Sequence, residues 1–413
     1  MIMKIIVQKF GGTSVQNEEG RKRAAEHVRK AVKEGYKVVV VVSAMGRKGD
    51  PYATDTLLDL IQTERASKRE VDLLLSCGET ISAVVFSNLL RSYHLKTEAY
   101  TGGQAGFRTS ENHTNAKIIE MKTERLRQAL KTLDCVVVAG FQGQTKTGEI
   151  TTIGRGGSDT SAAALGAALN AEWIDIFTDV DGVMTADPRI VANARKLQVM
   201  TYTEVCNMAY QGAKVIHPRA VEIAMNAKVP LRIRSTYTDH PGTLVTSIKK
   251  INRGRDVQER LITGITYMDN VTQIKVKAGE GEFDFQAKVF KAMAQEHISV
   301  DFFNISPQEI VYTVSDHVTD RALDALKQLG YQPECHRGCA KVSAVGAGIA
   351  GVPGVMAKIV SALTDLGIQI LQSADSHTTI WVLIHQKHLK AAVNALHKTF
   401  ELEKEEVEKT YNY

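Results

Sequence analysis

A strand-like run leads directly into a pair of glycines at Ile5-Ile-Val-Gln-Lys-Phe-Gly-Gly-Thr-Ser14. The glycines let a ligand approach the backbone closely, and bare amides at a following helix N-terminus suit phosphate oxygens. Lys9 ends the strand and can offset charge that develops on a transferred phosphoryl group. The spacing is not that of a Walker A loop, and the segment alone is compatible with an ordinary strand-to-helix turn.

Strands and helices alternate from this segment through about residue 245. The pattern predicts strands over Ile5–Gln8, Lys37–Val42, Cys135–Ala139 and Ile174–Thr178, and helices over Glu18–Glu34 and Thr160–Leu169. The valines from 38 to 42 are typical of a strand that is buried on both faces. We therefore expect an α/β fold, a mainly parallel sheet with helices on both faces and ligands at the carboxyl ends of its strands.

A different, repeating pattern begins near residue 261. Lys288 and Lys358 stand in the similar contexts Ala-Lys-Val-Phe and Ala-Lys-Ile-Val, 70 residues apart. Each repeat reads as strand, helix, strand, strand, helix and a short final strand, the order of a ferredoxin-like domain. Two such repeats indicate a module built by duplication. The polar stretch Asn252–Gln258 is the predicted linker.

Composition limits the classes of partner. The chain has 413 residues, of which 44% are hydrophobic and 23% charged, as in soluble globular proteins of two or three domains. A net charge of +5 without a concentrated basic run argues against nucleic acid. The longest aliphatic stretch, Val38 to Val42, is far shorter than a membrane helix of roughly 20 residues. No secretion signal is recognisable at the N-terminus, so a cytoplasmic protein with no membrane partner is expected.

The cysteines predict neither disulfides nor a metal site. Five cysteines are scattered at positions 77, 135, 206, 335 and 339, a set that favours a reducing compartment. The segment Cys335-His-Arg-Gly-Cys339 has a metal-like spacing but no second Cys/His pair. We expect a strand edge and turn there, and no protein-held metal.

A second glycine-rich loop reads Gly154-Arg-Gly-Gly-Ser-Asp-Thr160. Arg155 can hold a carboxylate with its planar guanidinium, and Ser158 with the amides of the next helix offers an anion site. Asp159 places a carboxylate near the phosphates. Helix capping alone would explain the serine or the aspartate, but it does not require an arginine among three glycines.

Two further loops follow. Phe177-Thr-Asp-Val-Asp-Gly-Val-Met-Thr-Ala-Asp-Pro-Arg189 is a strand that enters a polar loop without the ligand spacing of a calcium loop. A pocket for base and ribose at the end of that strand fits it better. Gly212-Ala-Lys-Val-Ile-His-Pro218 brings Lys214 into a turn before a helix.

Together these four loops resemble the signature of the aspartate kinases, within the amino-acid kinase fold, and they occur in the family's order along nearly the whole chain. The resemblance implies transfer of the γ-phosphoryl group of ATP to the β-carboxylate of L-aspartate, with Mg²⁺. It also implies an amino-acid kinase domain over residues 1–250 and two ACT domains, over 261–338 and 340–413, whose last strand can complete the first ACT domain. ACT domains bind regulatory amino acids.

The resemblance assigns roles residue by residue. Lys9 would stabilise the transferring phosphoryl group, and Asp159 would orient Lys9 and the metal-bound phosphates. Glu79 would bind the α-amino group of aspartate. The remaining substrate contacts would be made by Arg155 and Ser158, which hold its carboxylates, and by Thr54 and Phe141, which line the pocket. The implied nucleotide contacts are Lys9, Phe10, Gly11, Gly12, Ser43, Thr178, Asp179, Gly182, Val183, Met184, Asp187, Arg189 and Lys214.

Two positions depart from the family pattern. Met184 stands where many relatives have tyrosine, and Val180-Asp-Gly182 replaces the commoner Val-Pro-Gly. The chemistry suits the set, because the acceptor carboxylate is already ionised at neutral pH and needs no general base. Positioning and charge stabilisation are the main requirements. Asp159 is therefore not expected to accept a proton, and His113 and His217 are expected to be structural.

The tail contains a misleading motif. Gly346-Ala-Gly-Ile-Ala-Gly351, with Asp375 further on, has the spacing of a dinucleotide-binding loop. The first repeat lacks this motif, and the roughly 40 residues after Asp375 are too few for the rest of such a domain. Instead, the family resemblance implies an effector loop at Val352, Pro353, Gly354 and Val355, facing Gln372, Ser373, Asp375 and Ser376. A flexible loop without a ligand is the alternative.

The effector is read from residues 370–381, which differ from the Ser-Thr-Ser-Glu run of lysine- and threonine-controlled relatives. They resemble the diaminopimelate-sensitive kind found in Bacillus-type bacteria, so meso-diaminopimelate is expected, with lysine and threonine as alternatives. Gly281-Glu-Phe-Asp284 replaces Pro-Gly in the first repeat and leaves its own effector site open. A homodimer or larger homo-oligomer through the ACT domains is expected. The competing functions are a sister kinase for glutamate, acetylglutamate, carbamate or UMP, and a silent amino-acid sensor.

Overall fold

The computed structural model describes residues 3–247, 261–279, 281–346, 349 and 352–404. Contacts divide the chain into two compact units. The first consists of Met1–Val183, Lys196–Tyr210 and Lys214–Val257. The second consists of Met184–Arg195, Gln211–Ala213 and Gln258–Tyr413. The predicted linker, Asn252–Gln258, lies outside the described residues.

The first unit is built on an eight-stranded sheet in the order β10-β12-β11-β9-β1-β2-β6-β3. Every neighbouring pair is parallel except β11 with β12. The strands are β1 (Ile5–Phe10), β2 (Lys37–Val42), β3 (Thr97–Tyr100), β6 (Cys135–Ala139), β9 (Ile174–Thr178), β10 (Val199–Thr201), β11 (Leu231–Ser235) and β12 (Thr243–Thr246). The predicted bounds of β2, β6 and β9 are confirmed. Strand β1 is longer than predicted and includes Lys9.

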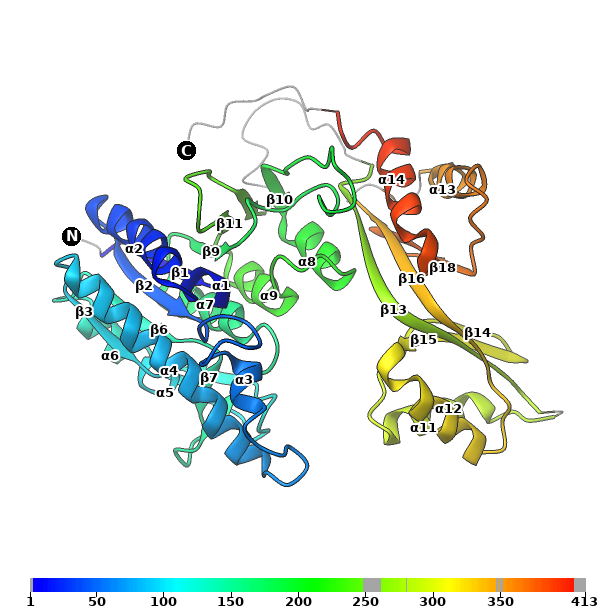
Figure 1. The fold of residues 1–413 in the computed structure, drawn as a ribbon, viewed down its shortest axis with the longest axis horizontal. Coiled ribbons are helices and arrows are strands. Elements are labelled where there is room, and N and C mark those ends of the chain that lie inside the picture. The colour runs from blue at the N-terminus through cyan, green and yellow to red at the C-terminus, as the bar shows by residue number, and fades with distance from the viewer. Residues whose placement is uncertain (1–2, 248–260, 280, 347–348, 350–351, 405–413) are drawn as a thin grey trace. The chain divides into compact units, whose positions relative to one another are not determined.

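Helices cover both faces of this sheet, as predicted (Figure 1). Helices α2 (Glu18–Lys33) and α4 (Lys68–Ser92) share one core with alternate residues of β1, β2 and β6. Helices α7 (Gly157–Leu169) and α9 (Pro218–Ala227) pack together, and α7 also contacts β1, β2 and β9. By length and composition alone α4 could cross a membrane, but half of its apolar window is buried in the protein, as in a core helix.

Smaller elements complete the first unit. A four-stranded sheet has the order β5-β4-β7-β8. Its strands are β4 (Phe107–Thr109), β5 (Ile118–Met121), β7 (Gln142–Gln144) and β8 (Ile150–Thr152). The short helices are α1 (Gly12–Val15), α3 (Thr54–Leu58), α5 (Gly102–Ala105), α6 (Glu124–Ala129) and α8 (Tyr202–Tyr210).

The second unit is a single six-stranded sheet in the order β14-β15-β13-β16-β18-β17. Its two central strands, β13 (Gly264–Lys277) and β16 (Glu334–Val345), run side by side through both repeats (Figure 1). The sequence predicted a short final strand for each repeat. In the first repeat this strand is present as the first part of β16, which continues without a break as the first strand of the second repeat. In the second repeat, no strand occurs over residues 400–404, and residues 405–413 lie outside the described part.

Each repeat has its own apolar core on this shared sheet. The first uses α11 (Phe285–Gln295), α12 (Thr319–Gln328), β14 (Asp301–Ile305) and β15 (Glu309–Ser315). The second uses α13 (Val355–Thr364), α14 (Leu389–Thr399), β17 (Gln372–Asp375) and β18 (Thr379–His385). Residues 335–339 lie inside β16, so the turn expected at the cysteine pair is a strand with irregular pairing.

Candidate active site

The first unit contains a pocket of about 630 Å³ at the carboxyl ends of its strands. Strand β1 lies between β2 and β9 in the sheet. The connections that follow neighbouring strands diverge at this point, and a crevice forms at the carboxyl ends of the strands. The lining includes every residue for which the family resemblance implies a catalytic or substrate role: Lys9, Thr54, Glu79, Phe141, Arg155, Ser158 and Asp159. Ser43, a predicted nucleotide contact, also lines it.

An ion pair joins the two candidate catalytic residues. Nζ of Lys9 lies 2.7 Å from Oδ1 of Asp159, and only 12% and 13% of the two side chains are exposed. Asp159 lies in the first turn of α7, because this helix begins at Gly157 instead of the predicted Thr160. Its other carboxylate oxygen accepts a hydrogen bond of 3.2 Å from the backbone amide of His217. Asp159 is thereby fixed, and it fixes the direction of the Lys9 ammonium.

Glu79 is the most unusual titratable group of the pocket. It comes from α4 and is 2% exposed. One carboxylate oxygen accepts a hydrogen bond of 3.2 Å from the amide of Ala44. The other is buried without a hydrogen-bond partner among the described residues. Burial raises the pKa of Glu79 to about 8, and a cationic ligand would relieve that cost.

The loop before α7 is shaped by glycines. Gly156 has φ of 68°, and a Cβ there would lie 2.1 Å from the ring of His217. Only glycine fits this position without displacing the ring. The tight turn presents Arg155 as an exposed side chain on the pocket wall, and no ion pair to another described residue engages its guanidinium. Ser158 is buried beside it in the first turn of α7. This end of the pocket suits anionic groups.

Sequence reasoning missed a buried network behind the pocket wall. Asp72 of α4 is fully buried and accepts hydrogen bonds from Nδ1 of His113 at 2.7 Å and from the amide of Thr114 at 3.0 Å. It also accepts one from Oγ1 of Thr152 at 2.5 Å. Thr114 and Thr152 both line the pocket. An acidic residue within the apolar run of α4 was the available signal. His113 serves this network and does not line the pocket.

Most of the predicted nucleotide contacts lie outside this pocket. Phe10, Gly11 and Gly12 follow Lys9, and the amide of Gly11 donates to the carbonyl of Phe177 at 3.4 Å. Asp179 pairs with Arg47 at 2.8 Å at the end of β9. The other predicted nucleotide contacts are divided between the two compact units. The first unit contains Thr178, Asp179, Gly182, Val183 and Lys214, and the second contains Met184, Asp187 and Arg189.

The pocket fits a magnesium ion that arrives with a nucleotide. Among the described residues no group of three metal-ligating side chains could hold an ion alone. The lining contains two carboxylates, Glu79 and Asp159, and Asp159 is the one beside Lys9. Mg²⁺ is typically held by one or two carboxylates together with substrate phosphates, so this donor set is compatible with it.

The predicted effector residues lie in the second ACT repeat. Gly354, with φ of 91°, precedes α13, and Val352 and Pro353 stand before it. Gln372, Ser373 and Asp375 lie on the edge strand β17. Gln372 accepts a hydrogen bond of 2.9 Å from Gln273 and so ties the two repeats together. Gly348 and Gly351 of the glycine motif lie outside the described residues.

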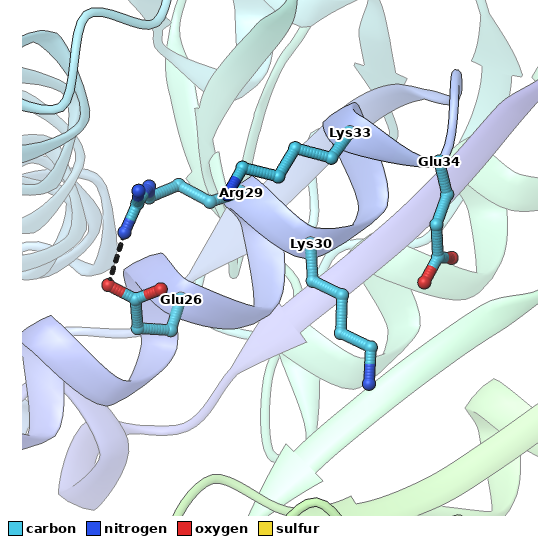
Figure 2. A pocket seen from close by; sticks show the side chains of 5 residues that line it. All are labelled: Glu26, Arg29, Lys30, Lys33 and Glu34. Atoms are coloured by element: carbon cyan, nitrogen blue, oxygen red, sulfur yellow. Dashed lines mark hydrogen bonds and ion pairs between the residues drawn. The ribbon is translucent and has the colours of Figure 1, made fainter.

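A shallower hollow of about 280 Å³ lies on α2. Figure 2 shows its lining side chains, Glu26, Arg29, Lys30, Lys33 and Glu34, and the ion pair of 2.6 Å between Arg29 and Glu26. No predicted site residue lines this hollow. Its charges belong to the exposed face of an amphipathic helix, so we assign it no chemistry.

Comparisons with known proteins agree with this geometry. Residues 4–235 match the amino acid kinase family, and residues 334–398 match an ACT domain. The chain is 66% identical to aspartokinase 1 of Bacillus subtilis, over 97% of this chain and all of that protein. It is 42% identical to the aspartokinase of Geobacillus stearothermophilus, over 98% of each.

The chain belongs to the aspartokinases. It is thus a kinase with aspartate as its acceptor, and its ACT repeats place it among allosterically controlled kinases. The structure of Escherichia coli aspartokinase III with aspartate and ADP matches 96% of this chain and 99% of that one, with a TM-score of 0.78 and 25% identity. The same enzyme with lysine and aspartate matches with a TM-score of 0.74. These likenesses confirm the predicted fold class.

We expect Asp72→Asn to disturb both stability and the pocket. The side-chain amide of asparagine has only one acceptor oxygen, so it cannot accept all of the hydrogen bonds that Asp72 accepts. The free energy of unfolding should therefore fall by about 2 kcal/mol. Because Thr114 and Thr152 shift with it, KM for aspartate should rise. Denaturant unfolding and steady-state kinetics measure the two effects. Asp175→Asn is the matched control: Asp175 is also fully buried, but it pairs with Arg232 near the start of β9. Equal KM values in both variants would show that the network does not shape the pocket.

Proposed function

We propose that the chain transfers the γ-phosphoryl group of ATP to the β-carboxylate of L-aspartate and forms 4-phospho-L-aspartate. The observation that carries this proposal is the charge pattern of the 630 Å³ pocket. Glu79, a buried carboxylate with no ion pair to another described residue, lies in the same pocket as three cationic side chains, Lys9, Lys68 and Arg155. Of these three, only Lys9 is paired with a carboxylate of the pocket, that of Asp159. An amino acid with a second carboxylate supplies one cationic and two anionic groups and so complements this pattern.

Each side chain then has one task. Glu79 binds the α-ammonium group of aspartate, and Arg155 with Ser158 holds its carboxylates. Thr54 and Phe141 close the pocket around the short side chain. An oxygen of the β-carboxylate forms the new bond to the γ-phosphorus, while the bond from that phosphorus to the bridging oxygen of ADP breaks. No proton is transferred, because the acceptor is already an anion.

Charge stabilisation is the remaining requirement. Lys9 offsets the charge of the transferring phosphoryl group, and Asp159 keeps the Lys9 ammonium in place through the 2.7 Å ion pair. When the nucleotide is bound, Mg²⁺ would neutralise the phosphates, and Asp159 is the carboxylate beside Lys9 that would help to hold the metal-bound phosphates. The nucleotide contacts are the glycine pair after β1, Ser43, Lys214 and the loop after β9.

The unpaired carboxylate also separates the competing readings. Acetylglutamate, carbamate and UMP carry no ammonium group for Glu79, so a sister kinase for one of them would leave this carboxylate buried without a cation. A silent sensor would not need the ion pair between Lys9 and Asp159. Glutamate remains the one alternative with the right charges, and its longer side chain makes it the substrate to test beside aspartate.

Lys9→Ala should abolish turnover while the protein stays folded. The ammonium of Lys9 acts on charge that develops in the transition state, so kcat should fall by roughly a thousandfold or more. The assay is aspartyl-hydroxamate formation with ATP, Mg²⁺ and L-aspartate, run in parallel with glutamate. Lys22→Ala is the control, because Lys22 forms an exposed ion pair with Glu18 on α2. Normal turnover by Lys9→Ala would refute the proposed site.

We further propose meso-diaminopimelate as the effector, bound between Val352–Val355 and the edge strand with Gln372, Ser373 and Asp375, together with Ser376 just after that strand. The proposal is supported by residues 370–381, and by the lysine complex of the E. coli relative as a precedent for an amino-acid effector in this family. The reaction would then be the first step toward lysine, threonine and methionine, in the cytoplasm. A homodimer or larger homo-oligomer through the ACT repeats is part of the same proposal.

The effector proposal predicts that meso-diaminopimelate alone changes the rate of the hydroxamate assay, and that Asp375→Asn weakens this response. Asp365→Asn, at the end of α13, is the control, because Asp365 is exposed and outside the proposed site. A response to lysine or threonine with none to diaminopimelate would overturn the effector while leaving the kinase intact.

A further inference from the structure

The loop that carries three of the proposed nucleotide contacts is built into the regulatory unit. Met184–Arg195 clusters with the ACT repeats, although residues on both sides of it belong to the kinase unit. The two kinase-unit residues that flank this loop, Val183 and Leu197, lie side by side, because the amide of Leu197 donates to the carbonyl of Val183 at 2.9 Å. Ala186 and Val191 are buried in the core of the second ACT repeat, with residues of α13, α14 and β18.

Thr185 fixes this loop through hydrogen bonds at every polar atom. Its amide donates to the carbonyl of Arg195, and its carbonyl accepts from the amide of Ile265 on β13, both at 2.8 Å. Its hydroxyl oxygen accepts from the amide of Arg195 at 2.9 Å. Nε2 of His397, on α14, lies 2.9 Å from the same hydroxyl. Thr185 is fully buried, and His397 is 1% exposed.

The direction of the last bond depends on the tautomer of His397. A neutral ring with its hydrogen on Nδ1, which faces Glu403 at 3.7 Å, accepts the hydrogen of the Thr185 hydroxyl at Nε2. Burial lowers the pKa of His397, which agrees with a neutral ring.

Further contacts tie the same loop, and a second one, to the ACT sheet. The hydroxyl of Tyr267 donates to Asp187 at 3.0 Å, and the side-chain amide of Asn394 donates to the carbonyl of Ile190 at 3.0 Å. In the second loop, Gly212 has φ of 107°, and a Cβ there would lie 1.9 Å from the carbonyl oxygen of Tyr267. This close approach precedes Lys214, another proposed nucleotide contact, by two residues.

We propose that Thr185 and His397 are positioning residues for the nucleotide: β13 and α14 of the ACT sheet hold the loop that contacts ATP. This inference rests on the proposed nucleotide contacts at Met184, Asp187 and Arg189. The apparent affinity for ATP then depends on the fraction of molecules in which the loop is in place. Loss of the hydrogen bonds that Thr185 makes with Arg195 and His397 lowers that fraction.

The test is Thr185→Val in the full chain. Valine keeps the volume but removes the hydroxyl that joins Arg195 and His397. KM for ATP should rise roughly tenfold, as for the loss of one buried hydrogen bond, while kcat at saturating ATP and KM for aspartate stay close to wild type. Thr185→Ser restores the hydroxyl and should restore KM for ATP. Asn394→Ala is a second variant, for use if Thr185→Val does not fold, because Asn394 is exposed and tolerates the change. It removes the hydrogen bond to the carbonyl of Ile190 and should raise KM for ATP about threefold.

Thr319→Val is the matched control. Thr319 is also fully buried, in the first ACT repeat, and donates to Oγ1 of Thr272 at 2.9 Å, but it contacts neither loop. It should lower the melting temperature without changing KM for ATP. The same KM for ATP in wild type, Thr185→Val and Asn394→Ala would overturn the inference. Wild-type protein that does not phosphorylate aspartate would instead overturn the proposed function, so the two failures are distinguishable.

Discussion

The charge pattern of the pocket depends on one buried carboxylate, that of Glu79, which has no cationic partner among the described residues. Glu79 lies on the face of α4 that packs against the sheet, where Ala83, Phe86 and Leu90 of the same helix belong to the core. It cannot turn toward water without moving this helix, so its unpartnered oxygen is held in the pocket. Because ionising this carboxylate in the empty site carries a desolvation cost, the site selects a ligand that brings a positive group. The other charges of the pocket are three cations, Lys9, Lys68 and Arg155, and one carboxylate, Asp159, so they favour a ligand whose remaining groups are anionic.

Much of this site could be predicted from the sequence. The carboxyl ends of parallel strands meet at one edge, so the glycine loops after β1 and before α7 had to approach each other once the alternating pattern was recognised. Strands such as Lys37–Val42 were predicted to the residue, because a run of valines between polar ends has little freedom to shift. Lys9 and Asp159 lie in separate motifs, and their ion pair follows from this topology.

What the sequence could not give depends on distant partners. Asp72 looks like an isolated charge in an apolar helix until His113, Thr114 and Thr152 are placed around it. The 70-residue repeat suggested two separate domains, because a periodic pattern cannot show that β16 ends one repeat and begins the next. Met184–Arg195 reads as a polar loop, and local polarity does not reveal which hydrophobic core Ala186 and Val191 join. Sequence patterns report which face is buried, but not what covers it.

The same loop suggests how one chain combines catalysis with control. Thr185 lies in a segment that begins directly after Val183 of the kinase unit. It makes a backbone hydrogen bond with β13 and a side-chain hydrogen bond with α14. In the proposed arrangement, the loop with three of the proposed nucleotide contacts is itself part of the core of the regulatory unit. The ACT sheet is also continuous, since β13 and β16 each serve both repeats, and β13 is the strand whose Ile265 amide donates to the carbonyl of Thr185.

Proton release on aspartate binding tests the role of Glu79 most directly. With a pKa of about 8, Glu79 is mostly protonated at pH 7 in the free enzyme, and an ammonium group beside it lowers that pKa. Titration calorimetry in buffers of different ionisation enthalpy should detect release of about one proton per L-aspartate at pH 7, and affinity that strengthens as the pH rises toward 8. Glu79→Gln should bind more weakly and release none. Wild-type binding without proton release, or unchanged affinity in Glu79→Gln, would contradict the account.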